Sequence, residues 1–150
     1  MAGRVILIVG FPGSGKTTYG VALKFRLGAK EYTDDYHKGA IGGNGAFDHG
    51  RDYQALIAGL QRGETWLASD REWCLPLKRR SVESAIRTAL PDVTIEWHFL
   101  STSSDDCRRG IIERARPSVN EELRKLEELA KYHHIPHGST IVEVPPHDAR

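Results

Sequence analysis

The sequence opens with a hydrophobic segment, a glycine-rich loop and a helical pattern in immediate succession, and this order constrains the fold more than any other feature. Residues 5–9 (VILIV) are apolar at every position, which predicts a buried strand of a parallel sheet. Residues 10–17 (GFPGSGKT) match the pattern G-x-x-x-x-G-K-[ST] completely. Residues 17–27 then have the periodicity of a helix. A strand, a glycine loop and a helix in this order are typical of a site for the phosphates of a nucleotide.

The chemistry of this glycine loop (residues 10–17) predicts the roles of its residues. Backbone N–H groups of the loop and of the helix start would bind phosphate oxygens. The expected nucleotide-binding residues are Gly10, Pro12, Gly13, Ser14, Gly15, Lys16, Thr17 and Thr18. Lys16 would contact the β- and γ-phosphates, and the Thr17 hydroxyl would bind Mg²⁺. The alternative is a glycine turn that only joins a strand to a helix, and a match over eight residues disfavours it.

The composition is ordinary and excludes several classes of protein. A chain of 150 residues, 39% hydrophobic and 27% charged, is expected to form one globular domain over residues 1–150. A net charge of +1 predicts no overall basic field for nucleic acid, so basic clusters are judged locally. No segment has the length of a membrane span, and residues 5–9 are too short for a signal peptide. We therefore expect a cytoplasmic protein without a membrane partner, in the host cytoplasm if a phage encodes it.

The spacing of cysteines and histidines does not predict a metal site. Cys74 and Cys107 are far apart and match no zinc-binding pattern, so reduced thiols are expected. Three histidines lie within residues 133–137, but Pro136 interrupts the helical spacing that shared ligands would need. We expect no zinc.

The remaining pattern alternates strands and helices. Strands are expected near 31–33, 65–68, 93–99 and 140–144, and helices near 52–62, 77–90, 104–115 and 120–132. Five strands with helical connections predict a three-layer α/β fold, in which helices cover both faces of a parallel sheet. The glycine-rich residues 39–50 predict a surface loop. Ligands of such sheets bind at the carboxyl ends of the strands.

The glycine loop predicts a bound nucleoside triphosphate, and the reaction must be inferred from other residues. The sequence has no N-K-x-D tetrapeptide, which GTPases use to recognise guanine, and it is too short for a large motor ATPase. A small kinase with the P-loop NTPase fold remains. Transfer to a hydroxyl needs a carboxylate that accepts the proton and cations that stabilise the developing charge.

Three carboxylates are expected at carboxyl ends of strands. Asp34 follows the strand at 31–33 and is the candidate general base. Its neighbour Asp35 would assist, hold the metal through water or contact the acceptor. Asp70 ends the strand at 65–68 and would support Mg²⁺ through water. For each of them, a capping or turn acid is the structural alternative.

Arginines and aromatic residues complete the expected site. An arginine from a helical lid at about 104–118 would close over the phosphates, and Arg114 and Arg116 are the candidates. These two lie on one side only if the helix ends between them. The candidate acceptor-binding residues are Asp35, Tyr36, His37, Arg71, Trp73, Arg79 and Arg80. The basic residues 78–80 would bind a phosphate backbone or form a solvated helix face. Trp73 would stack on a base or pack in the core.

The chain resembles the kinase domain of phage-type polynucleotide 5′-hydroxyl kinases and their P-loop kinase relatives. The likeness covers roughly residues 4–136 and is carried by residues 10–18, Asp34-Asp35-Tyr36, Ser69-Asp70, residues 77–80, the arginines of 108–116 and the helix at 119–132. The resemblance implies that Asp34 is the general base and that Arg114 or Arg116 contacts the phosphates. Thr33 and His37 stand where this family often has arginine. We expect no phosphatase domain after the kinase domain.

Residues 47–53 resemble a second family, the uridine-kinase-like enzymes with their F-D-H-P-x-x-x-D segment, although Gly50 replaces the proline. This resemblance implies a nucleoside acceptor, free or within DNA. Together the features predict an ATP- and Mg²⁺-dependent kinase that acts on a hydroxyl of a nucleic acid or nucleoside. The 5′-hydroxyl of a polynucleotide and hydroxymethyluracil in phage DNA are the acceptors that fit. The alternatives are a kinase of a small metabolite and a non-catalytic, toxin-like nucleotide-binding module.

Overall fold

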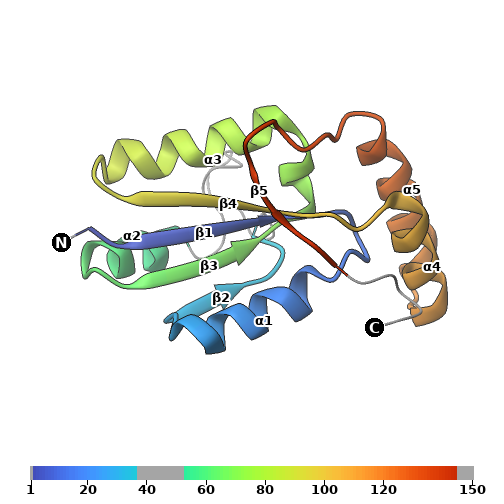
Figure 1. Cartoon of the computed structure of the whole chain (residues 1–150), viewed down its shortest axis with the longest axis horizontal. Helices are drawn as coiled ribbons and strands as arrows, with labels where there is room; N and C mark the ends of the chain where they lie inside the picture. The colour runs from blue at the N-terminus through green and yellow to red at the C-terminus, as the bar shows by residue number, and fades with distance from the viewer. Residues whose placement is uncertain (1, 37–52, 145–150) are drawn as a thin grey trace.

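The computed structural model describes residues 2–36 and 53–144. Within these ranges, the strands are β1 (Arg4–Val9), β2 (Glu31–Thr33), β3 (Thr65–Ser69), β4 (Thr94–Leu100) and β5 (Thr140–Val142). The helices are α1 (Lys16–Leu27), α2 (Tyr53–Gln61), the 3₁₀ helix η1 (Arg71–Cys74), α3 (Pro76–Ala89), α4 (Ser104–Arg114) and α5 (Val119–Ala130). The strands form one parallel sheet in the order β2-β3-β1-β4-β5 (Figure 1). The predicted α/β fold is confirmed.

The apolar run of β1 is explained by its place in the centre of the sheet. β1 pairs with β3 on one side and β4 on the other, so that Leu7 is in register with Ala68 and Trp97. All five residues of 5–9 are completely buried. A strand that is covered on both faces needs apolar side chains at every position, as this one has.

Alternate residues of β1 contact different helical layers. Ile6 and Ile8 pack in one cluster with Leu23 of α1. Val5, Leu7 and Val9 pack in the other cluster with Leu60 of α2 and with Val82 and Ile86 of α3. The alternation follows from the two-residue period of a strand. Figure 1 shows α1 and α3 on opposite sides of the sheet.

The helices α4 and α5 lie beyond the carboxyl ends of the strands, where the arrow of β1 points (Figure 1). They are anchored to the glycine loop by direct contacts. Thr102 Oγ1, just before α4, donates a hydrogen bond to the Ser14 carbonyl at 2.8 Å. A Cβ at Gly13 would lie 2.9 Å from the Cys107 carbonyl oxygen, so α4 comes as close to the loop as a glycine allows. The α4–α5 pair therefore forms a wall of the space in front of the loop.

Several helix ends agree with local signals in the sequence. Gly28 ends α1 with φ 64°, and Ser103 caps α4 by accepting a hydrogen bond from the Asp106 N–H. The 3₁₀ helix η1 was not expected, because residues 71–74 have no recognisable periodicity. It forms after Asp70, whose carboxylate accepts a hydrogen bond from the Glu72 N–H at 2.8 Å.

Some expectations fall outside the part of the chain that the structure describes. These are the loop at 39–50, His37 and most of the segment 47–53. Among the helices of the described ranges, none is both long and apolar enough to cross a membrane.

We expect stability to fall in mild acid because two half-buried histidines resist protonation. Burial lowers the pKa of His98, which contacts the Tyr19 hydroxyl at 2.7 Å, and burial likewise lowers the pKa of His133. The unfolded chain then binds more protons than the folded chain below about pH 6.5. Stability is therefore complete above that value and decreases as the pH falls through the lower folded pKa. Urea unfolding at pH 7.5 and 5.5 measures the difference.

The His98→Gln variant isolates one of these contributions. Glutamine keeps a partner for the Tyr19 hydroxyl but does not titrate, so the loss of unfolding free energy between the two pH values should be smaller than in the wild type. His137→Gln is the matched control, because His137 is exposed. An equal loss in wild type and His98→Gln would contradict the role given to His98.

Candidate active site

A pocket of about 570 Å³ lies between the glycine loop, the carboxyl end of β2 and the α4–α5 wall. Its lining residues are Pro12, Gly13, Ser14, Gly15, Lys16, Thr17, Thr18, Asp34, Asp35, Arg71, Arg114, Arg116, Ser118, Glu121 and Glu122. The structure therefore brings together the predicted loop, the predicted acids after β2 and both candidate lid arginines.

The backbone of the glycine loop has the conformation that a phosphate cradle needs. Gly13 and Gly15 have φ angles of 79° and 96°, a region in which residues with a Cβ are strained. Gly15 is also the N-cap residue of α1, directly before its first residue Lys16. Loop N–H groups and the positive end of a helix thus meet at one wall of the pocket, which fits the phosphates of a nucleotide.

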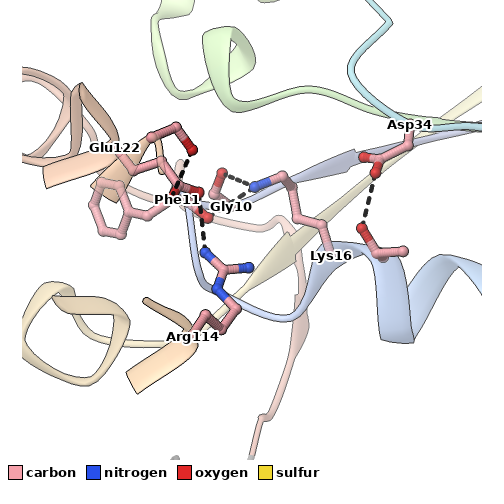
Figure 2. A network of polar contacts seen from close by, with 8 residues as sticks. Gly10, Phe11, Lys16, Asp34, Arg114 and Glu122 are labelled. Atoms are coloured by element: carbon pink, nitrogen blue, oxygen red, sulfur yellow. Dashed lines mark hydrogen bonds and ion pairs between the residues drawn. The ribbon is translucent and has the colours of Figure 1, made fainter. Parts of the chain in front are cut away.

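Lys16 is held at the pocket by two backbone carbonyls. Its Nζ donates hydrogen bonds to the carbonyl oxygens of Gly10 at 2.9 Å and Phe11 at 2.7 Å (Figure 2). Burial lowers the pKa of Lys16, and nearby groups that include Asp34 act in the opposite direction. The contacts involve neutral carbonyls only, so phosphate oxygens would be stronger partners for this ammonium group.

The carboxylate of Asp34 connects three elements of the fold. Its Oδ2 accepts a hydrogen bond from Thr17 Oγ1 of α1 at 3.0 Å, as Figure 2 shows, and its Oδ1 accepts one from Ser69 Oγ of β3 at 3.1 Å. The Asp35 N–H also donates to Oδ1 at 3.0 Å. Asp34 is therefore oriented beside the hydroxyl that is predicted to bind Mg²⁺.

Tyr32 supports this arrangement from the sheet. Its hydroxyl lies 2.6 Å from Ser69 Oγ. Burial raises the pKa of Tyr32 to about 12, so the phenol is neutral at physiological pH. α1 can approach β2 because residue 20 is glycine: a Cβ there would lie 2.4 Å from the Tyr32 ring.

The oxygen groups of the pocket fit a magnesium ion shared with phosphates. The Thr17 hydroxyl and the carboxylates of Asp34 and Asp35 are hard ligands of the kind that Mg²⁺ prefers. In residues 2–36 and 53–144, no group of three or more His, Cys, Asp or Glu residues forms a metal site by itself. A site with one or two protein oxygens agrees with the usual binding of Mg²⁺ through waters and substrate phosphates.

Asp70 occupies the carboxyl end of β3, as predicted, but does not line the pocket. It is completely buried, and its carboxylate caps η1. The capping alternative is thus present in the structure. Support of Mg²⁺ by Asp70 through water stays a prediction.

Arg114 and Arg116 both line the pocket because the helix ends between them. α4 stops at Arg114, and Ala115 has φ 49° in the left-handed region. From the sequence, both arginines were expected on one side only if the helix ended between them, and this turn ends it there. Arg114 Nη2 lies 3.1 Å from Glu122 Oε1 (Figure 2).

Glu121 and Glu122 are pocket residues that the sequence did not reveal. Both lie in the first turn of α5, where acids are favoured by the helix dipole in any protein. Glu121 Oε1 lies 3.7 Å from Arg71 Nη2. The ion pairs of these two acids with Arg71 and Arg114 identify them as site residues. Sequence spacing could not predict the pairs, because α5 reaches the pocket only through the turn at Ala115.

Two aromatic residues predicted to contact an acceptor are instead buried. Tyr36 is 1% exposed and Trp73 is 0% exposed, and their ring centroids lie 5.6 Å apart within the core. The short helix η1 directs Trp73 inward, against Trp97 of β4. Rings closed off in this way cannot stack on a base, which corrects the acceptor contact expected of Tyr36, whereas Trp73 follows the core-packing alternative that the sequence also allowed.

Arg79 and Arg80 also lie away from the glycine loop. Arg79 is buried, donates a hydrogen bond to the Trp73 carbonyl at 2.6 Å and lies over the Phe99 ring. Both arginines line a separate pocket of about 400 Å³ with Glu83 and Trp97. The basic residues 78–80 therefore do not open into the site of Lys16, and Arg79 has a structural role. Of the basic acceptor-binding candidates, Arg71 alone lines the first pocket among the described residues.

Comparison with known proteins shows the fold of P-loop kinases. No protein-family model and no curated protein matches the sequence. Solved structures, in contrast, match the fold of this chain. The APS kinase of Mycobacterium tuberculosis, solved with AMPPNP and APS, has a TM-score of 0.65 and 13% identity over 99% of this chain and 93% of its own. A gluconokinase from Sinorhizobium meliloti 1021 has a TM-score of 0.62 and 18% identity, with 99% and 86% covered. A fungal RNA kinase has a TM-score of 0.61 and 11% identity, with 96% and 74% covered.

Proposed function

We propose that this protein is an ATP- and Mg²⁺-dependent kinase that transfers the γ-phosphate to a hydroxyl group. One observation carries the proposal: the Thr17 hydroxyl, which is the metal ligand of the glycine loop motif, contacts the carboxylate of Asp34 at 3.0 Å. A candidate base thus lies next to the place expected for the γ-phosphate. A turn that only joined β1 to α1 would not need this carboxylate.

The residues of the pocket divide into three roles. Gly13, Gly15 and Lys16 would bind the phosphates, and Thr17 would hold Mg²⁺, which neutralises phosphate charge when it is bound. Asp34 would accept the proton of the acceptor hydroxyl through its Oδ atoms, with Asp35 beside it. Arg114 and Arg116 would reach the phosphates from the α4–α5 wall and stabilise the charge of the transition state.

The acceptor that the sequence favours is a hydroxyl of a nucleic acid or a nucleoside. This choice rests on the resemblance of the chain to polynucleotide kinases, and Arg71 is the basic residue on the pocket wall that would contact an acceptor phosphate. The fungal RNA kinase among the structural neighbours is compatible with it.

A small-metabolite acceptor is the second candidate, and the charge of the pocket favours it. Among the residues that the structure describes, the lining contains four basic residues (Lys16, Arg71, Arg114 and Arg116) and four acidic ones (Asp34, Asp35, Glu121 and Glu122). Since the basic residues also have to neutralise a triphosphate, little positive charge is left for a polyanionic acceptor. The gluconokinase and APS kinase neighbours are compatible with this candidate.

A substrate panel with radiolabelled ATP and Mg²⁺ tests the proposed function. The acceptors are 5′-hydroxyl DNA and RNA, free nucleosides, duplex DNA with hydroxymethyluracil, and small sugars and sugar acids. We expect phosphate transfer to one class. A nucleic acid substrate would lose affinity steeply as salt is raised, whereas a neutral metabolite would not. ATP binding without transfer to any of these acceptors would contradict the kinase and favour a nucleotide-binding module.

A further inference from the structure

Two arginines of the pocket are each paired with an acid in the first turn of α5. Arg114 Nη2 lies 3.1 Å from Glu122 Oε1, and Arg71 Nη2 lies 3.7 Å from Glu121 Oε1. All four side chains line the pocket that contains the glycine loop. The Glu122 side chain is only 13% exposed, and its Oε2 accepts a hydrogen bond from the Ser118 hydroxyl at 3.3 Å, so the carboxylate has a second partner besides Arg114.

These pairs place negative charge beside the expected phosphates. Figure 2 shows Arg114 and Glu122 facing each other, and both residues line the same pocket as Lys16 and the glycine loop. A triphosphate bound at the glycine loop would be repelled by the carboxylate of Glu122. It would also have to compete with this carboxylate for the guanidinium of Arg114. Glu122 therefore opposes nucleotide binding in two separable ways.

We propose that Glu122 holds the lid arginine Arg114 in the nucleotide-free protein and releases it to the phosphates when nucleotide binds. Glu122 is thus a positioning residue that sets nucleotide affinity through Arg114, and this inference rests on the proposed function because it requires a nucleotide in the pocket. The exchange is non-covalent: Arg114 replaces carboxylate oxygens with phosphate oxygens as hydrogen-bond acceptors.

The sign of the effect follows from the two contributions. Glu122→Gln removes the repulsion of the phosphates and also the need to separate the ion pair, so nucleotide should bind more tightly. Because the pair is partly exposed, with the Arg114 side chain 34% exposed, each contribution is modest. We expect the Kd for Mg²⁺ with the non-hydrolysable analogue AMPPNP to fall roughly three- to tenfold.

A double-mutant cycle with Arg114→Met separates release of the arginine from simple charge repulsion. In the Arg114→Met background, Glu122→Gln still removes the repulsion but has no ion pair to separate. The improvement in Kd should therefore be smaller there than in the wild-type background, and the difference measures the exchange itself. Isothermal titration calorimetry at low ionic strength gives the four Kd values.

Glu127→Gln is the matched control on the same helix. Glu127 forms an ion pair with Arg108 at 3.5 Å, but its side chain is 62% exposed and neither residue lines the pocket. Its Kd for AMPPNP should equal that of the wild type. Urea unfolding of each variant, in the absence of nucleotide, shows whether the fold is retained.

The outcomes distinguish this inference from the proposed function. If the wild type binds AMPPNP but Glu122→Gln improves the Kd equally with and without Arg114, the exchange is wrong and the kinase proposal stands. An unchanged or higher Kd in Glu122→Gln would also overturn the exchange. If the wild type does not bind AMPPNP at all, the proposed function fails and the inference fails with it. A larger improvement in the presence of Arg114 supports it.

Discussion

Asp34→Asn is expected to lower kcat for phosphate transfer by roughly 10²- to 10⁴-fold while ATP still binds. Asparagine has the shape of aspartate and can keep contacts with the hydroxyls of Thr17 and Ser69, which lie 3.0 and 3.1 Å from the carboxylate oxygens. It cannot accept the proton of an acceptor hydroxyl. The loss should therefore appear in the chemical step, and single-turnover transfer with saturating ATP measures it.

Asp35→Asn is the matched control for this experiment. Asp35 also lines the pocket, and its φ of 47° lies in the left-handed region that asparagine tolerates. We expect a smaller loss of kcat than in Asp34→Asn. A large loss in Asp35→Asn with retained activity in Asp34→Asn would assign the base to Asp35 and leave Asp34 as a residue that orients Thr17.

The contact between Asp34 and Thr17 shows how far the sequence could predict the site. The glycine loop and the acid after residues 31–33 were expected at one edge of the sheet, because parallel strands end on the same side. This argument needs only the order of elements, and the strand and helix positions required for it are confirmed. It could not provide the hydrogen bonds from Ser69 or the support from Tyr32, because these depend on the packing of α1 against β2.

The direction in which a side chain points was harder to predict than the position of its residue in the fold. Arg79 was assigned to an acceptor, but it lies three and seven residues before Val82 and Ile86, on the buried side of α3. The helical periodicity of this segment therefore predicts that Arg79 lies on the buried side. Trp73 offered no such signal, because the inward direction of its ring is set by the tight turns of η1.

Glu121 and Glu122 represent a third kind of case. In sequence they are first-turn acids of an amphipathic helix, a feature that many helices have. Their place in the pocket depends on the left-handed residue Ala115, which reverses the chain between α4 and α5. Neither glycine nor asparagine, the usual left-handed residues, stands at this turn, so the sequence did not predict it. The tertiary structure was needed to find the pairs with Arg71 and Arg114.

Lys16→Met should lower the efficiency of phosphate transfer by roughly 10³-fold or more. Methionine is similar in length and apolar, so it fills the same space without a charge for the β- and γ-phosphates. Within residues 2–36 and 53–144, the hydrogen bonds of Lys16 Nζ go to the neutral carbonyls of Gly10 and Phe11. The variant should therefore lose little stability, and the defect should appear as weak AMPPNP binding and slow transfer.

Lys24→Met is the control, because Lys24 lies in the same helix α1 but does not line the pocket. Its transfer rate and AMPPNP affinity should match the wild type.

Lys16 and Arg114 would both exchange protein oxygen partners for phosphate oxygens when nucleotide binds, but the partners of Lys16 are neutral and the partner of Arg114 is charged. Loss of Lys16 should therefore be much more severe than loss of Arg114, whose attraction to the phosphates is partly offset by Glu122. Equal defects in Lys16→Met and Arg114→Met would contradict this ranking of the two cations.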